Sequence, residues 1–348
     1  YRVGNSVSGN IINDSCVQDI TYTAIIKRYP NGVPGGLFMS NPPPGYSEAK
    51  QKFEKIISPQ GFDWWSNPGK YPQNWLSHSA YRGVPDSSNP NDYTGLENDA
   101  DKISKTGVNW ANDYPSGASS VGPTTLKVTY VEDKNLRKQA NCEAKLETLQ
   151  FIYYVQNELG HPDWSIANDE GFDTNYNIQE NSCPNIPSEF KEAEKYFPPL
   201  PYVREGRRII ALHTLTGKEI KRVGSPPKAL TSFETALAVG NYANDLHNCN
   251  QDSTLETSFE TSGDITGSGL FQVPFESFIP ETTDGFLVAE KNIGVTRLVN
   301  GATRLQPITM ATGQAAGAIA AYAVQQNVQP RQVNPIFVQK ELLDAKSV

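Results

Sequence analysis

The alternation of apolar and polar residues predicts helices and strands along much of the chain. Residues 17–27 alternate and are rich in β-branched side chains, which is typical of a strand. Residues 134–159 carry apolar side chains along one side and predict a long helix that Gly160 ends. Residues 47–57 predict a short amphipathic helix with Ser47 as its N-cap.

The second half of the chain alternates short strand-like segments with two helices. Residues 232–247 fit either a helix or a strand, and the pattern alone leaves both open. The remaining expected elements are strand-like segments at 209–215, 270–278 and 285–290 and helices at 307–326 and 335–344. Long loops rich in Pro, Asn and Asp fill 28–46 and 58–125, where Trp64 and Trp65 are interpreted as packing residues rather than a sugar platform.

The helix expected at 307–326 has an unusual composition. Pro307 suits the first turn, where its missing N–H costs nothing, so the helix is expected to begin at Gln306 or Pro307. Gly313, Gly317 and several alanines give it little side-chain bulk, which allows close approach to a sheet or another backbone. The free amides of its first turn would attract an electron-rich group. A plain close-packed core helix is the alternative interpretation.

Charge and motifs exclude several classes of function. The net charge of −8 over 348 residues argues against a nucleic-acid partner, and no apolar run is long enough for a membrane span. The sequence contains no G-x-G-x-x-G after a strand, no P-loop, no G-x-S-x-G and no H-E-x-x-H. A self-contained nucleotide-binding fold is therefore not encoded in these residues.

The four cysteines are far apart in the sequence. Cys16, Cys142, Cys183 and Cys249 have no ligand-like spacing, so no metal site is expected. Two disulfides or four buried thiols both fit this count. The composition favours a secreted or periplasmic protein over the cytoplasmic alternative, and a chain beginning at Tyr1 without a signal peptide is expected to be a processed product or a fragment.

Residues 285–324, "GFLVAEKNIGVTRLVNGATRLQPITMATGQAAGAIAAYAV", together with "PYVREGRRI", "DLH" and "VPFESFIPE", resemble a known family. They are similar to FAD-dependent oxidoreductases of the clan that includes the succinate dehydrogenase and fumarate reductase flavoproteins, in a branch of bacterial enzymes. The resemblance covers about 200–325 well and 17–200 more loosely. It lacks the family's N-terminal Rossmann segment, whose glycine-rich turn holds the FAD pyrophosphate. That segment is expected as a part cleaved from this chain or as a separate partner chain.

The resemblance implies a set of site residues. The residues expected to bind the cofactor are Glu290, Gln306, Pro307, Ile308, Thr309 and Met310. Glu290 would meet the ribityl hydroxyls, and the helix N-terminus would meet the flavin pyrimidine edge. Arg304 matches the clan's arginine that grips a substrate carboxylate. Ala289 departs from the family's usual glycine, which would narrow the approach to the cofactor.

Each candidate catalytic residue also has a structural interpretation. Arg304 could instead pair locally with Glu290 or Glu276. His247 is a candidate proton acceptor that Asp245 could orient, but a lone histidine often has only a structural role. In "REGRR", one or two arginines are expected to face an anionic partner or the cofactor, with the others solvated or paired with Glu205.

The fold expected from these observations is α+β or α/β. A substrate, or cap, domain at 1–200 would precede the C-terminal part of a Rossmann-like FAD-binding domain at 201–330, with a C-terminal helix and tail at 331–348. The expected function is oxidation of an unidentified small molecule by hydride transfer to FAD. The alternative is a non-catalytic structural or binding protein that retains the fold, and bound flavin would separate the two.

Overall fold

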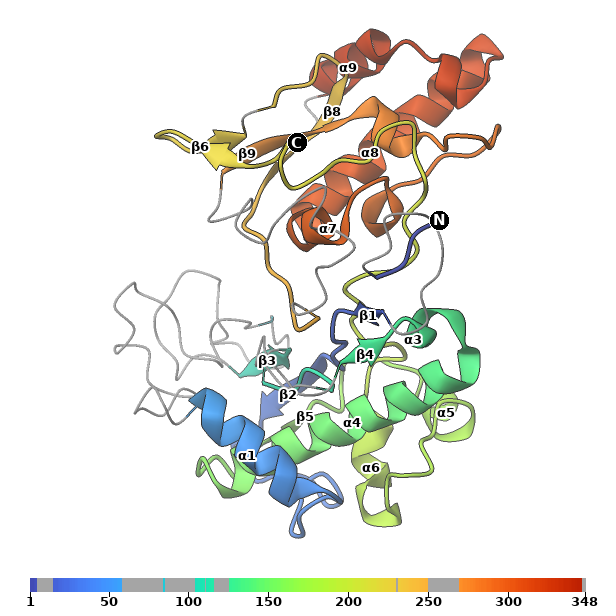
Figure 1. Ribbon diagram of the computed structural model, residues 1–348. Helices are drawn as coiled ribbons and strands as arrows, with labels where there is room; N and C mark the ends of the chain where they lie inside the picture. The colour runs from blue at the N-terminus through green and yellow to red at the C-terminus, as the bar shows by residue number, and fades with distance from the viewer. Residues whose placement is uncertain are drawn as a thin grey trace. The chain divides into compact units, whose positions relative to one another are not determined.

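The computed structural model describes residues 1–4, 15–57, 84, 104–109, 111–115, 125–229, 231–249 and 269–345. The chain is a mixed α/β protein with several small sheets (Figure 1). It forms two compact units, each assembled from segments distant in sequence. Unit 1 comprises Tyr1–Gln18, Thr125–Asp133 and Arg204–Val348, and unit 2 comprises Asp19–Thr124 and Lys134–Val203.

Unit 2 is built on a three-stranded antiparallel sheet. Strand β2 (Ala24–Arg28) lies between β3 (Lys105–Val108) and β5 (Trp164–Ile166). Helix α4 (Lys134–Asn157) packs against β5 and against α1 (Tyr46–Ile57). Aromatic rings fill the space between the two helices, and Phe53 and Phe151 meet edge to face with centroids 5.2 Å apart. The described part of unit 2 also contains the short helical segments α5 (Thr174–Gln179), η3 (Ser188–Phe190) and α6 (Lys191–Glu194).

Helix α4 also buries two ionisable side chains. Glu147 is 5% exposed, and its Oε1 lies 3.3 Å from Lys52 Nζ. Burial raises the pKa of Glu147 to about 8, although the charge of Lys52 opposes the shift. Lys145 is fully buried, 3.6 Å from Glu194, and burial lowers its pKa to about 8 against the opposing charge of Glu194. Unit 2 therefore contains an acid and a base whose ionisation is coupled to folding.

Unit 1 contains a four-stranded sheet in the order β6–β7–β9–β8. Its strands are β6 (Arg222–Val223), β7 (Lys228–Ala229), β8 (Ala236–Asn241) and β9 (Leu270–Pro274). A two-stranded sheet pairs β1 (Cys16–Val17) with β4 (Leu126–Lys127), which leads into α3 (Thr129–Glu132). The helical segments are η5 (Phe275–Phe278), η6 (Glu290–Asn292), α7 (Arg297–Thr303), α8 (Gln306–Gln326), η7 (Pro330–Gln332) and α9 (Pro335–Asp344). Helices α8 and α9 pack against β8 and against each other (Figure 1).

Helix α8 begins and ends where its sequence predicts. Pro307 occupies the first turn, and Asn327 ends the helix in the left-handed conformation, with φ of 55°. One side of the helix is buried in the unit 1 core: Ile308, Ala311, Thr312, Ala315, Ala316, Ile319 and Ala323. The other side is exposed within this chain, where Met310 is 69% and Val324 is 81% exposed. A Cβ atom added at Gly313 or Gly317 would meet nothing within 4 Å.

Several local predictions were wrong or undecided. The strand expected at 209–215 does not form, because only Ala211 and Leu215 make isolated bridges there. The strand expected at 270–278 ends at Pro274, and η5 follows it. The strand expected at 285–290 does not form, because residues 286–289 have no regular structure and Glu290 begins the 3₁₀ segment η6. Helix α1 begins at Tyr46, so Ser47 lies inside it and is not its N-cap. The segment 232–247, which fitted either state, contains strand β8 because it pairs with β9 from Ala236 to Asn241.

The four cysteines form two disulfides. Cys16 pairs with Cys249 inside unit 1, and Cys142 pairs with Cys183 inside unit 2. Of the two states that the cysteine count allowed, the structure therefore has the oxidised one. Pairing of this kind is typical of an oxidising compartment.

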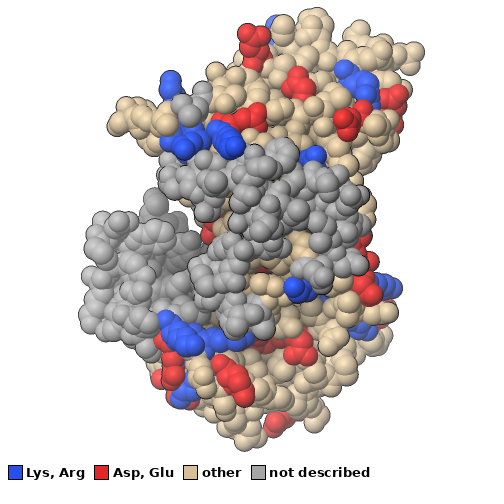
Figure 2. Space-filling view, in the orientation of Figure 1, with Lys and Arg blue, Asp and Glu red and all other residues tan. Residues whose placement is uncertain are grey.

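The surface in Figure 2 mixes both signs of charge. Lys and Arg side chains are interspersed with Asp and Glu side chains on the coloured part of that face, so the net charge of −8 does not gather in one patch there. Within the described ranges, no helix is both long and apolar enough to cross a membrane. The same ranges hold no group of three His, Cys, Asp or Glu side chains arranged for a metal ion.

Candidate active site

The structure brings Arg304 and His247 together on one carboxylate. Arg304 is the C-cap of α7, two residues before α8 begins, and its side chain is 2% exposed. Its Nη2 donates to the backbone oxygen of Asp245 at 2.8 Å and to Asp245 Oδ2 at 3.0 Å. His247 Nε2 lies 3.3 Å from Asp245 Oδ1. The two candidate catalytic residues, distant in sequence, therefore share Asp245 as a partner.

The charges around Asp245 keep it ionised. Burial by itself would raise its pKa, but the hydrogen bond and charge of His247, followed by the charges of Arg304 and Arg204, hold it well below its ordinary value. The pKa of Lys291 is also lowered, which for a lysine favours the neutral form. Burial and the charges of Arg304 and Arg204 cause this shift, and the charge of Glu290 opposes it. The cluster therefore combines cationic side chains with a carboxylate that stays charged at neutral pH.

Glu290 lies beside the first turns of α8. Its backbone N–H donates to Thr312 Oγ1 at 3.3 Å, and its φ of 56° puts a non-glycine residue in the left-handed region. Such a conformation costs about 1 kcal/mol or more, and it persists where the surroundings fix it. The residue predicted to meet the ribityl chain is thus held against the helix predicted to meet the flavin ring.

The N-terminus of α8 differs in detail from the prediction. Leu305 is its N-cap and supplies no side-chain hydrogen bond. The Thr309 amide already donates to the Leu305 oxygen at 2.8 Å, so it closes the first turn. Met310 follows in the i→i−4 ladder. Ile308 is therefore the one of the three predicted amides that precedes the first intrahelical bond, and the exposed Gln306 and Pro307 lie beside it.

The arginines of "REGRR" have separate environments. Arg208 Nη1 lies 3.7 Å from Glu205 Oε2, which confirms that one of them pairs with Glu205. Arg207 forms an ion pair with Glu132 at 3.2 Å. Arg204 is 1% exposed, and its positive charge helps to lower the pKa of Asp245. Arg204 is therefore the arginine of this group that lies in the candidate site.

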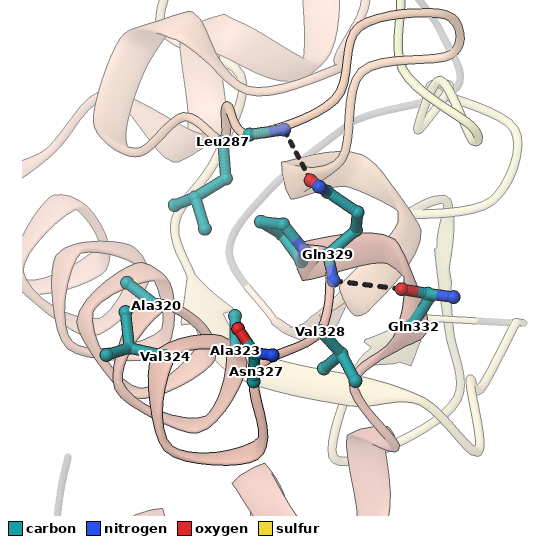
Figure 3. Close-up of a pocket in the computed structure, with 10 residues that line it drawn as sticks. Leu287, Ala320, Ala323, Val324, Asn327, Val328, Gln329 and Gln332 are labelled. Carbon is teal, nitrogen blue, oxygen red and sulfur yellow. Dashed lines mark hydrogen bonds between the residues drawn. The ribbon is translucent and has the colours of Figure 1, made fainter.

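Two pockets lie in unit 1, and Asp245, His247 and Arg304 line neither of them. The larger, about 570 Å³, lies beside the C-terminal half of α8 (Figure 3). Gln329 lines this pocket and makes two hydrogen bonds there. Its side-chain Oε1 accepts from the Gly285 backbone N–H at 2.7 Å, and its backbone N–H donates to Gln332 Oε1 at 2.9 Å. The smaller, about 370 Å³, includes Ala289 and Asn292, which flank Glu290. Because α8 rises about 1.5 Å per residue, the larger pocket lies far from the first turn and does not belong to this site.

The sequence named Arg304 and His247 as candidates but did not predict that both would contact Asp245. Asp245 was considered as a group that orients His247, whereas Glu290 and Glu276 were considered as partners of Arg304. The structure gives Arg304 the carboxylate of Asp245, 59 residues away in the sequence. Lys291 was also missed, because a lysine after Glu290 carries no pattern that distinguishes it from a surface residue.

We expect Gly301→Ala to lower the free energy of unfolding by about 1–2 kcal/mol. A Cβ at Gly301 in α7 would lie 2.4 Å from Asn244 Oδ1 and 3.0 Å from Leu246 Cδ2, on both sides of Asp245 in the sequence. The matched control is Gly317→Ala in α8, where nothing is contacted and the better helix propensity should add about 0.5–1 kcal/mol. Urea titration of both variants measures the difference, and equal effects would contradict the close packing of α7 on the Asp245 segment.

Comparison with known proteins defines the class of this chain. The family model described as FAD dependent oxidoreductase matches residues 31–342, which is most of the chain. The chain therefore belongs to the FAD dependent oxidoreductase family. No curated protein and no solved structure gives a match.

Proposed function

We propose that this chain supplies the substrate site and the isoalloxazine side of the flavin site in an FAD-dependent oxidoreductase that oxidises a small organic molecule. The observation that supports this most directly is that Arg304 and His247 both contact Asp245. Arg304 lies two residues before α8 begins. FAD supplies the hydride acceptor, flavin N5, when it is bound. The protein side chains bind the substrate, orient it and hold its proton.

Arg304 is the proposed carboxylate-binding residue. A guanidinium presents several donors in a planar fork, and Nη2 already serves Asp245. The contact with Asp245 fixes the orientation of the fork in the candidate site. Bidentate contact with a substrate carboxylate is the recognition that this geometry favours.

His247 is the proposed proton acceptor. Its side chain is 17% exposed, and Nε2 faces the Asp245 carboxylate. The contact with Asp245 fixes the orientation of the ring. An imidazole that accepts a proton there becomes an imidazolium, which the Asp245 carboxylate stabilises by charge.

The residues present fit one end of FAD. The uncapped N-terminus of α8 and the hydroxyl-binding capacity of Glu290 suit the flavin ring and its ribityl chain. The sequence has no glycine-rich turn for the pyrophosphate. We therefore propose that an N-terminal FAD-binding segment, on the same precursor or on a separate chain, holds the rest of the cofactor.

The exposed side of α8 is the proposed contact for that segment. No charged residue occurs between Arg304 and Arg331, and Gly313, Gly317 and Ala320 leave the helix backbone accessible. In this proposal residues 1–200 form the substrate region, 201–330 the flavin region and 331–348 the terminal helix and tail. The two disulfides favour a secreted or periplasmic location.

The proposal predicts that this chain purified alone contains far less than stoichiometric FAD. The reason is that the pyrophosphate contacts are missing, and they supply much of the binding of a dinucleotide. Visible flavin absorbance, measured before and after a dinucleotide-binding segment is supplied, tests this. Mass spectrometry of native material should find that segment, joined or separate.

Two results would contradict the proposal in different ways. Stoichiometric FAD on this chain alone would show that no further segment is needed. Absence of flavin from native material, with the segment present, would remove the assignment of Arg304 and His247 to flavin chemistry.

A further inference from the structure

The segment that carries His247 is fastened to β1 at two points. Cys249, two residues after His247, is bonded to Cys16 in β1. The His247 amide donates to the Gln18 side-chain Oε1 at 3.2 Å. Gln18 is 1% exposed, and it follows β1 directly. Strand β1 and the residue that follows it therefore hold the His247 segment through one covalent bond and one part-buried hydrogen bond.

Gln18 is itself held in place. Its backbone N–H donates to Glu205 Oε1 at 3.0 Å, and Glu205 is 2% exposed and lies next to Arg204 in the sequence. The pairing of β1 with β4 fixes Cys16 and Val17 just before it. Gln18 thus connects the His247 backbone to the segment that contributes Arg204 to the site.

The backbone between these two fastenings is strained. Asn248 and Cys249 have φ values of 61° and 60°, so two consecutive non-glycine residues adopt the left-handed conformation. This conformation is uncommon for residues other than glycine, and it persists where the surroundings enforce it. Both residues are buried, at 3% and 1% exposure. Release of either fastening would allow this turn to relax and His247 to move.

We propose that Gln18 and the Cys16–Cys249 disulfide form a clamp that positions His247 beside Asp245 and Arg304, so that the arrangement of the site depends on the oxidised disulfide. Gln18 acts as a positioning residue, because its contact is with the His247 backbone and not with the imidazole. The functional meaning of the clamp rests on the proposed function of the site. The clamp itself is a property of unit 1 and can be measured without flavin or substrate.

Opening of the clamp needs a reductant, which we take to be a dithiol. The dithiol is oxidised to its own disulfide, and the Cys16–Cys249 S–S bond breaks as the two sulfurs receive two electrons and two protons. Both cysteines then become free thiols. The turn loses its covalent restraint, while the Gln18 hydrogen bond to the His247 backbone remains.

Histidine NMR of the full chain tests the clamp. The chain has four histidines, so the ring signals after ¹³C-histidine labelling are few, and a His247→Gln variant assigns the signal of interest. We expect the His247 ring signal to shift or broaden when Cys16 and Cys249 are both replaced by Ser, and when the native protein is treated with a dithiol. The same change is expected for Gln18→Met, which has similar size but no acceptor for the His247 amide. Gln18→Glu keeps an acceptor oxygen and should restore the native signal.

Controls separate the clamp from general loosening. Replacement of Cys142 and Cys183 by Ser removes the unit 2 disulfide and should leave the His247 signal unchanged. The signal of His213, which pairs with Glu219 at 2.9 Å in unit 1, should stay in place in every variant. A His247 signal that is unchanged in the Cys16/Cys249 double variant and in Gln18→Met would overturn the proposal. So would a change of equal size in His213, because it would indicate that unit 1 as a whole has loosened.

Discussion

Arg304→Lys is expected to slow flavin reduction in the intact holoprotein about 10- to 100-fold while changing flavin content less than about 2-fold. Arg304 Nη2 bonds both the backbone oxygen and the carboxylate of Asp245, and its side chain is 2% exposed. A lysine ammonium can replace one of these contacts, but it cannot reproduce the planar fork of donors that a guanidinium presents. The loss should therefore fall on the reaction and not on cofactor retention.

Anaerobic bleaching of the flavin band by a panel of small carboxylic acids, amines and sugars measures this effect. The matched control is Arg331→Lys, because Arg331 also anchors backbone oxygens in unit 1, at Pro280 and Thr283, but lies outside the candidate site. Bleaching in the control should match the native protein. Normal kcat/KM in Arg304→Lys would show that this arginine serves the fold, and a preference for neutral substrates would argue against carboxylate binding.

The second large effect is expected in unit 2, where Glu147→Gln should stabilise the protein at alkaline pH by about 2–4 kcal/mol. The pKa of Glu147 is raised from 4.5 to about 8, so between these values the folded state binds a proton that the unfolded state has lost. The stability contributed by this group is therefore full below pH 4.5 and falls as pH rises through 8. A glutamine resembles the neutral carboxyl and avoids the loss.

Urea unfolding at a series of pH values measures the difference between the native protein and the variant. The two should agree near pH 5 and diverge toward pH 9. Lys145 acts in the opposite sense, because its lowered pKa makes stability rise with pH between about 8 and 10.5, but this contribution cancels in the comparison. Glu143→Gln, one turn earlier on α4 at a half-buried position, is the control for replacing a carboxyl by an amide on the same helix. A constant difference across the series would indicate that Glu147 is ionised throughout.

Local sequence signals predicted the helices better than the strands. Helix α8 runs from Gln306 to Gln326 against a prediction of 307–326, and α9 matches the predicted range. Proline in the first turn and a one-sided apolar pattern act within the helix itself, so they can be read from neighbouring residues. Strand β8 was undecided because its identity depends on pairing with β9, about 30 residues away in the sequence. Residues 285–290 have strand-like composition, but no neighbouring strand pairs with them in the described part of the chain.

The candidate site was predictable by residue type more than by contact. Arg304, His247 and Glu290 could be named because a family resemblance marked them. Their partners Asp245 and Thr312 come from other segments, and only the folded chain shows which carboxylate or hydroxyl each one meets. Gln18 had no signal of its own, since a glutamine near the start of a predicted strand is more often a surface residue.

The Cys16–Cys249 bond also has a consequence for how the chain survives cleavage. The whole of unit 2 lies between these two cysteines in the sequence, inserted into unit 1 as Asp19–Thr124 and Lys134–Val203. A protease that cuts one peptide bond anywhere in unit 2 therefore produces two fragments that stay linked through sulfur. The nicked molecule would migrate as one species on a non-reducing gel and as two after reduction. Unit 1 keeps its covalent continuity by a route that does not pass through the backbone of unit 2.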